Sequence, residues 1–366
     1  MSKLDELLKY LENNMDTEHI EKNIRHHKKA LNFEKIDYLP LSVSYPQNEF
    51  KSCSIPEIHE DFEKMMFNEL LRCIAVSDIK DGSHPTIRAN YGVGIMPSLF
   101  GVKSRIVDNN MPWVEHVDSE DDIKEIVSKG IPDIKTGFGG KIFELHEFFK
   151  EKLADYPKCS KYIRINHPDL QGPFDIAHLV WGSDIYLAVY DYPELLKEFL
   201  ELITETYIKI LKEIKKGIND EADGFVFDKG KFYKGRVVIR NDSAVNLSKD
   251  MYKEFIKPYD EKILKAFGSG AIHFCGRADH WVFDAMETRG NCSMNFGYMP
   301  NKVFGETYLE FLRERFTASK MPIVEYVLSE EEFKSFNRQR FNTGMSLHTS
   351  AKSRDEACEM LKMTMN

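Results

Sequence analysis

Short apolar runs alternate with long amphipathic segments along most of the chain. The apolar runs have the length of buried strands, and the segments between them place apolar residues at helical spacing. Strands that alternate with long helices pair in parallel. Eight such units predict an α/β fold, a single (β/α)8 TIM barrel, with an open doubly wound sheet as the alternative. The predicted strands span residues 39–43, 86–90, 162–166, 224–228, 271–275, 292–296, 322–326 and 343–347.

The amphipathic segments carry recognisable helix ends. In "LSKDMYKEFIKPYDEKILKAFG", Ser248 can cap the first turn, Pro258 predicts a break and Gly268 can end the helix. Residues 1–35 also show helical spacing, so we expect an N-terminal helical extension ahead of a barrel domain over 36–366. The segment after the fourth predicted strand, residues 229–243, is expected to form a hairpin over the barrel mouth.

Composition narrows the class of protein. Hydrophobic residues make up 42% and charged residues 30% of the 366 residues, which is typical of a globular protein. No apolar run reaches the ~20 residues that span a bilayer, and the N-terminus lacks a signal-peptide core, so we expect a cytoplasmic protein without a membrane partner. The net charge of −9 and the absence of a dense basic stripe exclude nucleic acid as the main partner.

One predicted strand ends in an unusual way, with "AIHFCG". His273 and Cys275 lie two residues apart, so their side chains point to the same side of the strand. The carboxyl end of a barrel strand opens into the mouth, where active sites lie, and both side chains are good zinc ligands. The alternative is a buried histidine beside a buried thiol, held by ordinary packing.

A wider resemblance rests on four stretches of sequence. The chain contains "LQGPFDIAHLVWG", "YPELLKEFLELIT", "EADGFVFD" and "AIHFCG", and from about residue 30 onward it resembles the uroporphyrinogen decarboxylase superfamily. The resemblance implies a single (β/α)8 barrel, and it implies a homodimer. It also implies one of two chemistries, either cofactor-free decarboxylation of a porphyrinogen or zinc-dependent methyl transfer with a thiol or a corrinoid protein as partner.

Functional positions of the decarboxylases are not kept in this chain. The family carries an arginine-rich segment after its first strand, where this chain reads "LPLSVSYPQNEF". Asn90 stands where the family has an aspartate, and an amide cannot stabilise a protonated pyrrole. Leu179 stands at about the place of a family tyrosine, and Met345 stands where the family has a histidine. These departures argue against porphyrinogen decarboxylation.

The methyltransferase pattern is matched in part. His273 and Cys275 match the H-x-C of the zinc methyltransferases, whose further cysteine corresponds to Met345, and a thioether is a poor zinc ligand. We therefore predict His348 as the third zinc ligand. The alternatives for the third zinc ligand are Cys292 and Glu325. On this resemblance the cofactor is Zn²⁺, with a corrinoid carried on a partner protein.

Other polar residues are expected at the same mouth, because a barrel gathers its strand ends there. Arg240, Asn241 and Asp242 are predicted catalytic residues: Arg240 to bind a carboxylate or phosphate, and Asp242 to act as an acid or base or to orient a ligand. This polar mouth predicts a small polar substrate. The predicted substrate-binding residues are Asn90, Tyr91, Gln171, Asp228, Asn295 and Tyr326.

Three functions follow from these residues. The first is a methyltransferase with a zinc-activated thiol, acting with a small methyl donor or methylating a partner corrinoid protein. The second is a metal-free decarboxylase or other lyase acting on a small carboxylated substrate, with Arg240 and Asp242 essential. The third is a ligand-binding barrel without turnover. A bound zinc ion is expected only for the first.

Overall fold

The computed structural model describes residues 2–297 and 305–365. Its largest element is a sheet of six strands in which every neighbouring pair is parallel. The predicted parallel α/β architecture is therefore confirmed. In sheet order the strands are β1 (Leu41–Ser44), β13 (Met345–Ser350), β12 (Ile323–Val327), β11 (Asn291–Gly297), β10 (Gly270–Cys275) and β9 (Val238–Arg240).

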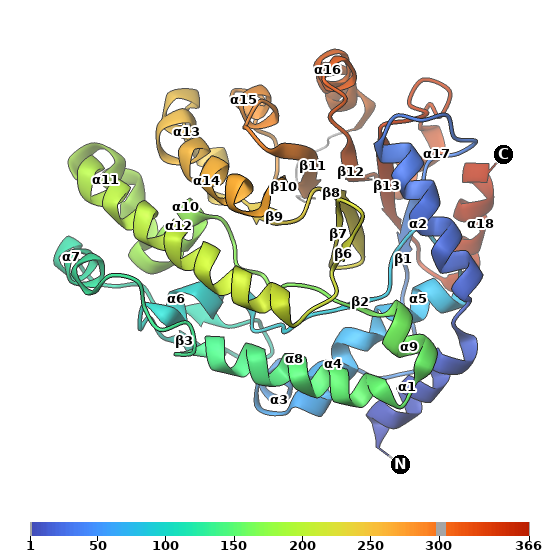
Figure 1. Cartoon of the computed structure of the whole chain (residues 1–366). Coiled ribbons are helices and arrows are strands. Elements are labelled where there is room, and N and C mark those ends of the chain that lie inside the picture. The colour runs from blue at the N-terminus through green and yellow to red at the C-terminus, as the bar shows by residue number, and fades with distance from the viewer. Residues whose placement is uncertain (1, 298–304, 366) are drawn as a thin grey trace.

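A second parallel pair, β2 (Thr86–Ile87) with β5 (Arg164–Ile165), lies opposite the large sheet, and helices surround both (Figure 1). Within the described residues, no strand ladder joins β5 to β9 or β2 to β1, so continuous barrel closure is not seen. A backbone hydrogen bond crosses each of these two gaps. The N–H of Gly172 donates to the Arg240 carbonyl at 2.6 Å, and the N–H of Gly82 donates to the Leu41 carbonyl at 2.6 Å.

The predicted fourth strand is wrong in its pairing. Residues 224–228 contain β7 (Phe225–Asp228), but β7 belongs to an antiparallel sheet with β6 (Glu221–Ala222) and β8 (Lys231–Lys234). The fourth parallel strand in chain order is β9, inside the segment that was expected to be an excursion. Both stretches are short, apolar and β-branched or aromatic, so local pattern does not separate them.

The β7–β8 hairpin lies inside the curve of the large sheet rather than over the mouth (Figure 1). Phe225 stacks on Phe232 at 4.8 Å between ring centroids, and both pack in a core cluster with residues of β9, β10, β12 and α2. At the end of the hairpin, Gly235 has φ +122°, and a Cβ there would meet the Gly270 backbone at 2.6 Å. The hairpin therefore fills the interior below the strand ends.

Helices form where the sequence predicts them. The N-terminal extension contains α1 and α2, which pack against α4 and against β13 and β8 respectively. Ser248 caps α13, α14 starts at Lys257 with Pro258 in its first turn, and Gly268 follows its last residue, which confirms the predicted break. The early helices are α1 (Lys3–Asn14), α2 (Thr17–Leu31), α3 (Ile55–Glu60), α4 (Phe62–Leu71), α5 (Cys73–Asp78), α6 (Ile95–Leu99), α7 (Glu120–Lys129), α8 (Phe138–Ala154) and α9 (Pro157–Tyr162).

The later helices complete the outer layer (Figure 1). They are α10 (Pro173–Trp181), α11 (Ile185–Asp191), α12 (Pro193–Lys216), α13 (Lys249–Phe255), α14 (Lys257–Phe267), α15 (Val282–Met286), α16 (Gly305–Ala318), α17 (Glu330–Ser335) and α18 (Arg354–Met365). A small antiparallel hairpin, β3 (Ser104–Arg105) with β4 (Trp113–Val114), lies outside the ring.

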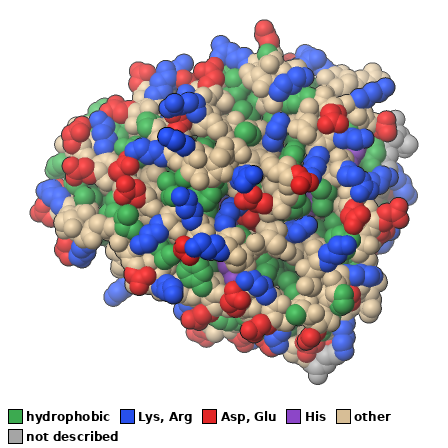
Figure 2. Space-filling model, viewed as in Figure 1, with side chains coloured by type: hydrophobic (Ala, Val, Ile, Leu, Met, Phe, Trp, Pro, Cys, Tyr) green, Lys and Arg blue, Asp and Glu red, His purple; other side chains and the backbone are tan. Residues whose placement is uncertain are grey.

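The surface carries both signs of charge. Figure 2 shows acidic and basic side chains interspersed over the visible face, with no field of one sign. Among the described helices, none combines the length and the hydropathy that crossing a membrane requires.

Candidate metal centre and cavity

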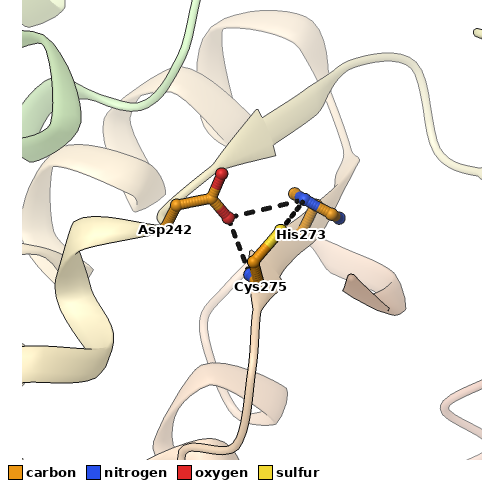
Figure 3. Close-up of side chains that lie close together, drawn as sticks. All are labelled: Asp242, His273 and Cys275. Carbon is orange, nitrogen blue, oxygen red and sulfur yellow. Dashed lines mark hydrogen bonds and ion pairs between the residues drawn. The ribbon is translucent and has the colours of Figure 1, made fainter. Parts of the chain in front are cut away.

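Three side chains meet at the carboxyl end of β9 and β10. His273 and Cys275 lie on β10, and Asp242 lies in the turn directly after β9. Because β9 pairs with β10 so that Arg240 is opposite His273, Asp242 lies beside Cys275, whose N–H donates to Asp242 Oδ1 at 2.7 Å. Figure 3 shows the three side chains pointing toward one another. Their ligand atoms all lie within 4.8 Å of one another.

The spacing of these atoms suits zinc. His273 Nε2 lies 3.5 Å from Cys275 Sγ and 3.5 Å from Asp242 Oδ1. A tetrahedral zinc ion with bonds of about 2.0–2.3 Å separates its nitrogen, sulfur and oxygen ligands by roughly 3.5 Å. Nitrogen, sulfur and carboxylate oxygen are also the donor types that zinc prefers. The donor set and its spacing therefore both fit this metal.

A neighbouring amide holds the histidine ring in the orientation that a ligand needs. Asn295 Nδ2 donates to the Val324 carbonyl at 2.5 Å, so Asn295 Oδ1 faces His273 Nδ1, 2.5 Å away. The proton of the neutral imidazole is thereby kept on Nδ1, and the Nε2 lone pair faces Cys275 and Asp242. Asn295 was predicted to bind substrate, and in the structure it orients His273.

A second carboxylate fixes the turn that carries Asp242. Asp175, in the first turn of α10, is buried and accepts the N–H of Asp242 at 2.6 Å and of Ser243 at 2.8 Å. Burial and the nearby Asp242 carboxylate raise the pKa of Asp175 well above its usual range. The carboxyl groups of Asp175 and Asp242 lie close together, and a cation bound beside them would stabilise their negative charge. Sequence reasoning missed Asp175, although it lies in the quoted stretch "GPFDIAHL".

Without a metal, the cysteine is a thiol at neutral pH. Burial, reinforced by the Asp242 carboxylate, raises the pKa of Cys275 to about 12. Burial also lowers the pKa of His273, so its imidazole is neutral. Neither group ionises the other, whereas a cation bound to the sulfur would favour the thiolate form.

A cavity of about 590 Å³ opens beside this group. A polar cavity of this volume suits a small molecule. The predicted residues on its wall are Gln171, Asp228, Arg240, Asp242, His273, Cys275, Asn295 and His348.

Four predicted residues are not on this wall. Tyr91 is fully buried and stacks on Phe138, and Tyr326 is buried as well. Asn90 donates from Nδ2 to Glu69 Oε1 at 3.0 Å. Asn241, predicted as catalytic, is buried and donates from Nδ2 to Asp260 Oδ2 at 2.6 Å, so it anchors the end of β9 to α14. A strand end reaches the mouth, but the direction of each side chain depends on local twist.

Arg240 reaches the cavity wall as part of a buried charge network. Its guanidinium pairs with Asp228, and its Nε lies 3.5 Å from Asp169, which also pairs with Arg88 at 3.4 Å. Although burial alone would raise it, Arg240 holds the pKa of Asp228 below its usual range. Arg240 therefore already has two carboxylate partners, unlike the free anion-binding group that was predicted.

Lys229 is one cavity residue that sequence reasoning missed. It follows β7 with φ +50°, its side chain reaches the cavity, and it has no ion pair among the described residues. Partial removal from water by the surrounding protein lowers its pKa, and so do the neighbouring charges of Arg88 and Arg72. This unpaired ammonium is the group best placed to contact an anionic substrate. The only signal in the sequence is the turn-forming pair Lys229–Gly230 between two β-prone stretches.

The predicted third ligand lies outside the three-residue group. His348 is on the cavity wall, but its Nδ1 bonds Ser42 Oγ at 2.9 Å. Ser42 in turn donates to Glu325 at 2.9 Å, and Glu325 pairs with Lys231. The alternative ligand Glu325 is thus already occupied, and the geometry favours Asp242 as the third ligand.

Two further residues lie at the wrong end of their strands. Cys292 is the second residue of β11, whose carboxyl end, Gly297, reaches the cavity. Met345 is the first residue of β13 and lines a small pocket with Phe33, away from the strand end. Met345, which the resemblance aligns with the family's further cysteine, therefore lies at the start of its strand and away from His273 and Cys275.

Comparisons with known proteins place this geometry in context. Residues 27–297 match the family model described as Uroporphyrinogen decarboxylase (URO-D). Among solved structures, the chain is similar to a methyltransferase from Methanosarcina mazei, with a TM-score of 0.61 and 14% sequence identity over 93% of this chain and 97% of that one. At this identity the likeness shows the fold alone. A search of curated proteins finds no match.

Proposed function

The chain belongs to the uroporphyrinogen decarboxylase family, and from this premise we propose that it is a methyltransferase with a zinc-activated thiol. The observation that carries the proposal is the convergence of His273, Cys275 and Asp242 at the strand ends, beside the cavity. A methyltransferase among the similar folds adds support. We propose further that the eight parallel strands form the (β/α)8 barrel that the family implies, with the site at its carboxyl end.

Zinc held by His273, Cys275 and Asp242 would lower the pKa of a bound thiol and so supply a thiolate at neutral pH. The other tasks fall to the chain itself. Asn295 keeps the His273 proton on Nδ1, and Asp175 holds the turn on which Asp242 lies. The cavity beside them gives a substrate room to approach the reacting groups.

The cavity wall supports a small polar substrate. The free ammonium of Lys229 offers a contact for an anionic group, while Arg240 is balanced by Asp228 and Asp169. In this proposal the bond between the methyl group and a small donor breaks, the demethylated donor leaves, and the methyl group passes to the zinc-activated thiolate or to a reduced corrinoid on a partner protein. The two acceptors are distinguished by assaying demethylation of the donor with a thiol and with a reduced corrinoid.

Metal content of the freshly purified protein tests the proposal. We expect about one zinc ion per wild-type chain by plasma mass spectrometry, and loss of that zinc in Cys275→Ser. Cys292→Ser is the matched control, because that thiol lies at the other end of its strand, and its zinc content should equal that of the wild type.

Two results would contradict the proposal. Zinc retained in Cys275→Ser would overturn the ligand assignment. A wild-type protein that takes up no zinc after incubation with the metal would favour the metal-free lyase or the ligand-binding barrel, and substitution of Arg240 and Asp242 would then separate those two.

A further inference from the structure

A second cavity, of about 370 Å³, lies at the amino end of β1, away from the strand ends that carry His273 and Cys275. The residues of α2 that line this cavity are spaced three or four apart, so they lie on one face of the helix. The residues that α18 contributes from the other side have the same spacing. Those residues are His19, Lys22, Asn23 and His26 on α2, and Cys358, Leu361 and Lys362 on α18.

The floor of this cavity is apolar. Leu39, Leu41, Ile79 and Leu361 line it and are all buried. A floor of this kind offers hydrocarbon contact to a ligand, at about 25 cal/mol for each Å² removed from water. The volume lies at the lower end of the range for small-molecule sites.

The rim carries only positive charge. Three lysines and two histidines line the cavity, and none of its described lining residues is acidic, in a chain of net charge −9. Lys80 pairs with Asp16. Lys22 and Lys362 have no ion pair or hydrogen bond within the described part of the chain, so two ammonium groups face the cavity from opposite helices. An anion is the complement that this rim lacks.

The pKa values of the two histidines reflect the same positive charge on the rim. Each histidine donates one hydrogen bond from Nε2, His19 to the Asp81 carbonyl at 3.0 Å and His26 to the Tyr38 carbonyl at 2.8 Å. Burial lowers the pKa of both, and the charge of Lys22 lowers each further. The cavity is therefore positively charged without any protonation of these rings.

We propose that this cavity binds a small amphipathic anion, a carboxylate with a short hydrocarbon tail, whose tail lies on the apolar floor and whose charge lies between Lys22 and Lys362. Four separate chain segments bound the cavity, so the occupant is a free molecule rather than an extended surface. The proposal does not depend on the metal centre, because the two cavities share no lining residue.

Calorimetric titration with octanoate, 1-octanol and octylamine tests this proposal on the full chain. We expect octanoate to bind at one site per chain, 1-octanol to bind at least ten-fold more weakly, and octylamine not to bind. The double variant Lys22→Gln/Lys362→Gln should bind octanoate about ten-fold more weakly, because two ion pairs are lost. Lys212→Gln, an exposed lysine on α12, is the matched control and should bind as the wild type does.

Each contrary result is decisive. Equal binding of octanoate and 1-octanol would show that the lysines do not contribute, and octanoate binding unchanged in the double variant would place the anion elsewhere. No octanoate binding by the wild type would overturn the proposal. Unfolding midpoints without ligand establish that the variants are folded, which is expected because Lys22 and Lys362 are exposed.

Discussion

At the scale of single residues, the proposed metal centre can be tested through the hydrogen bond between Asn295 and His273. Asn295→Leu removes the acceptor for His273 Nδ1–H, so the Nε2 lone pair is no longer held toward Cys275. We expect zinc affinity to fall about 10- to 100-fold, measured by competition with a chromogenic chelator. Asn295→Gln keeps an amide that can both donate and accept, and it should retain more of the affinity than Asn295→Leu does. Equal affinities for the two variants would show that the bond does not orient the ring.

Sequence alone predicted part of this centre. His273 and Cys275 could be paired because two positions on one strand share a face whatever the rest of the fold does. Asp242 was recognised as chemically useful, but its place as their neighbour depends on the pairing of β9 with β10, which is a long-range contact. Lys229 carried no comparable signal, since a lysine in a turn is usually solvated.

At the scale of elements, the stretch that was predicted as the fourth parallel strand differs from the stretch that forms it. The stretches around Val226 and Val238 have similar hydrophobicity, and the first was predicted to be the barrel strand. The structure gives that place to β9, because Gly235 lets the chain pass the Gly270 backbone and continue alongside β10. Such a close approach between backbones leaves no trace in hydrophobic periodicity.

The approach of α10 to β9 is equally tight and gives an element-scale prediction. A Cβ at Gly172 would meet the Arg240 carbonyl oxygen at 2.6 Å, so Gly172→Ala must displace the end of β9 and with it Asp242. We expect a loss of about 1–3 kcal/mol in the free energy of unfolding by urea titration, and weaker zinc binding. Gly217→Ala, where the nearest atom lies 3.4 Å away, is the matched control. A Gly172→Ala protein as stable as the control would contradict this account.

At the scale of the whole molecule, burial makes the protein sensitive to acid. It lowers the pKa of ten histidines: His19, His26, His27, His59, His84, His146, His167, His178, His273 and His348. The unfolded chain takes up protons near pH 6.5, whereas the folded chain resists them, so stability falls as the pH falls below that value. The raised pKa values of the buried carboxyl groups of Asp81, Asp175, Asp220 and Asp260 oppose this trend but are fewer.

His27 and His84 provide a direct test of how buried histidines reduce stability in acid. Their rings lie 4.7 Å apart in the interior, the pKa of His27 is about 4 and that of His84 is well below 6.5. Neither ring nitrogen of His84 has a hydrogen-bond partner among the described residues. We expect His84→Phe to keep the fold and to reduce the loss of unfolding free energy by about 1 kcal/mol per pH unit between pH 6 and 5, measured by urea titration at each pH. An unchanged slope would show that His84 is not buried in its neutral form.

The β7–β8 hairpin has a consequence for how this protein can diverge. Asp228, Lys229 and Lys231 reach the cavity from the hairpin and its turn, while His273 and Cys275 reach it from the wall. If the proposed function holds, recognition and reactivity are encoded in separate stretches of the gene. A few changes in the short hairpin would then alter which molecule is accepted, and the reacting groups would be inherited intact.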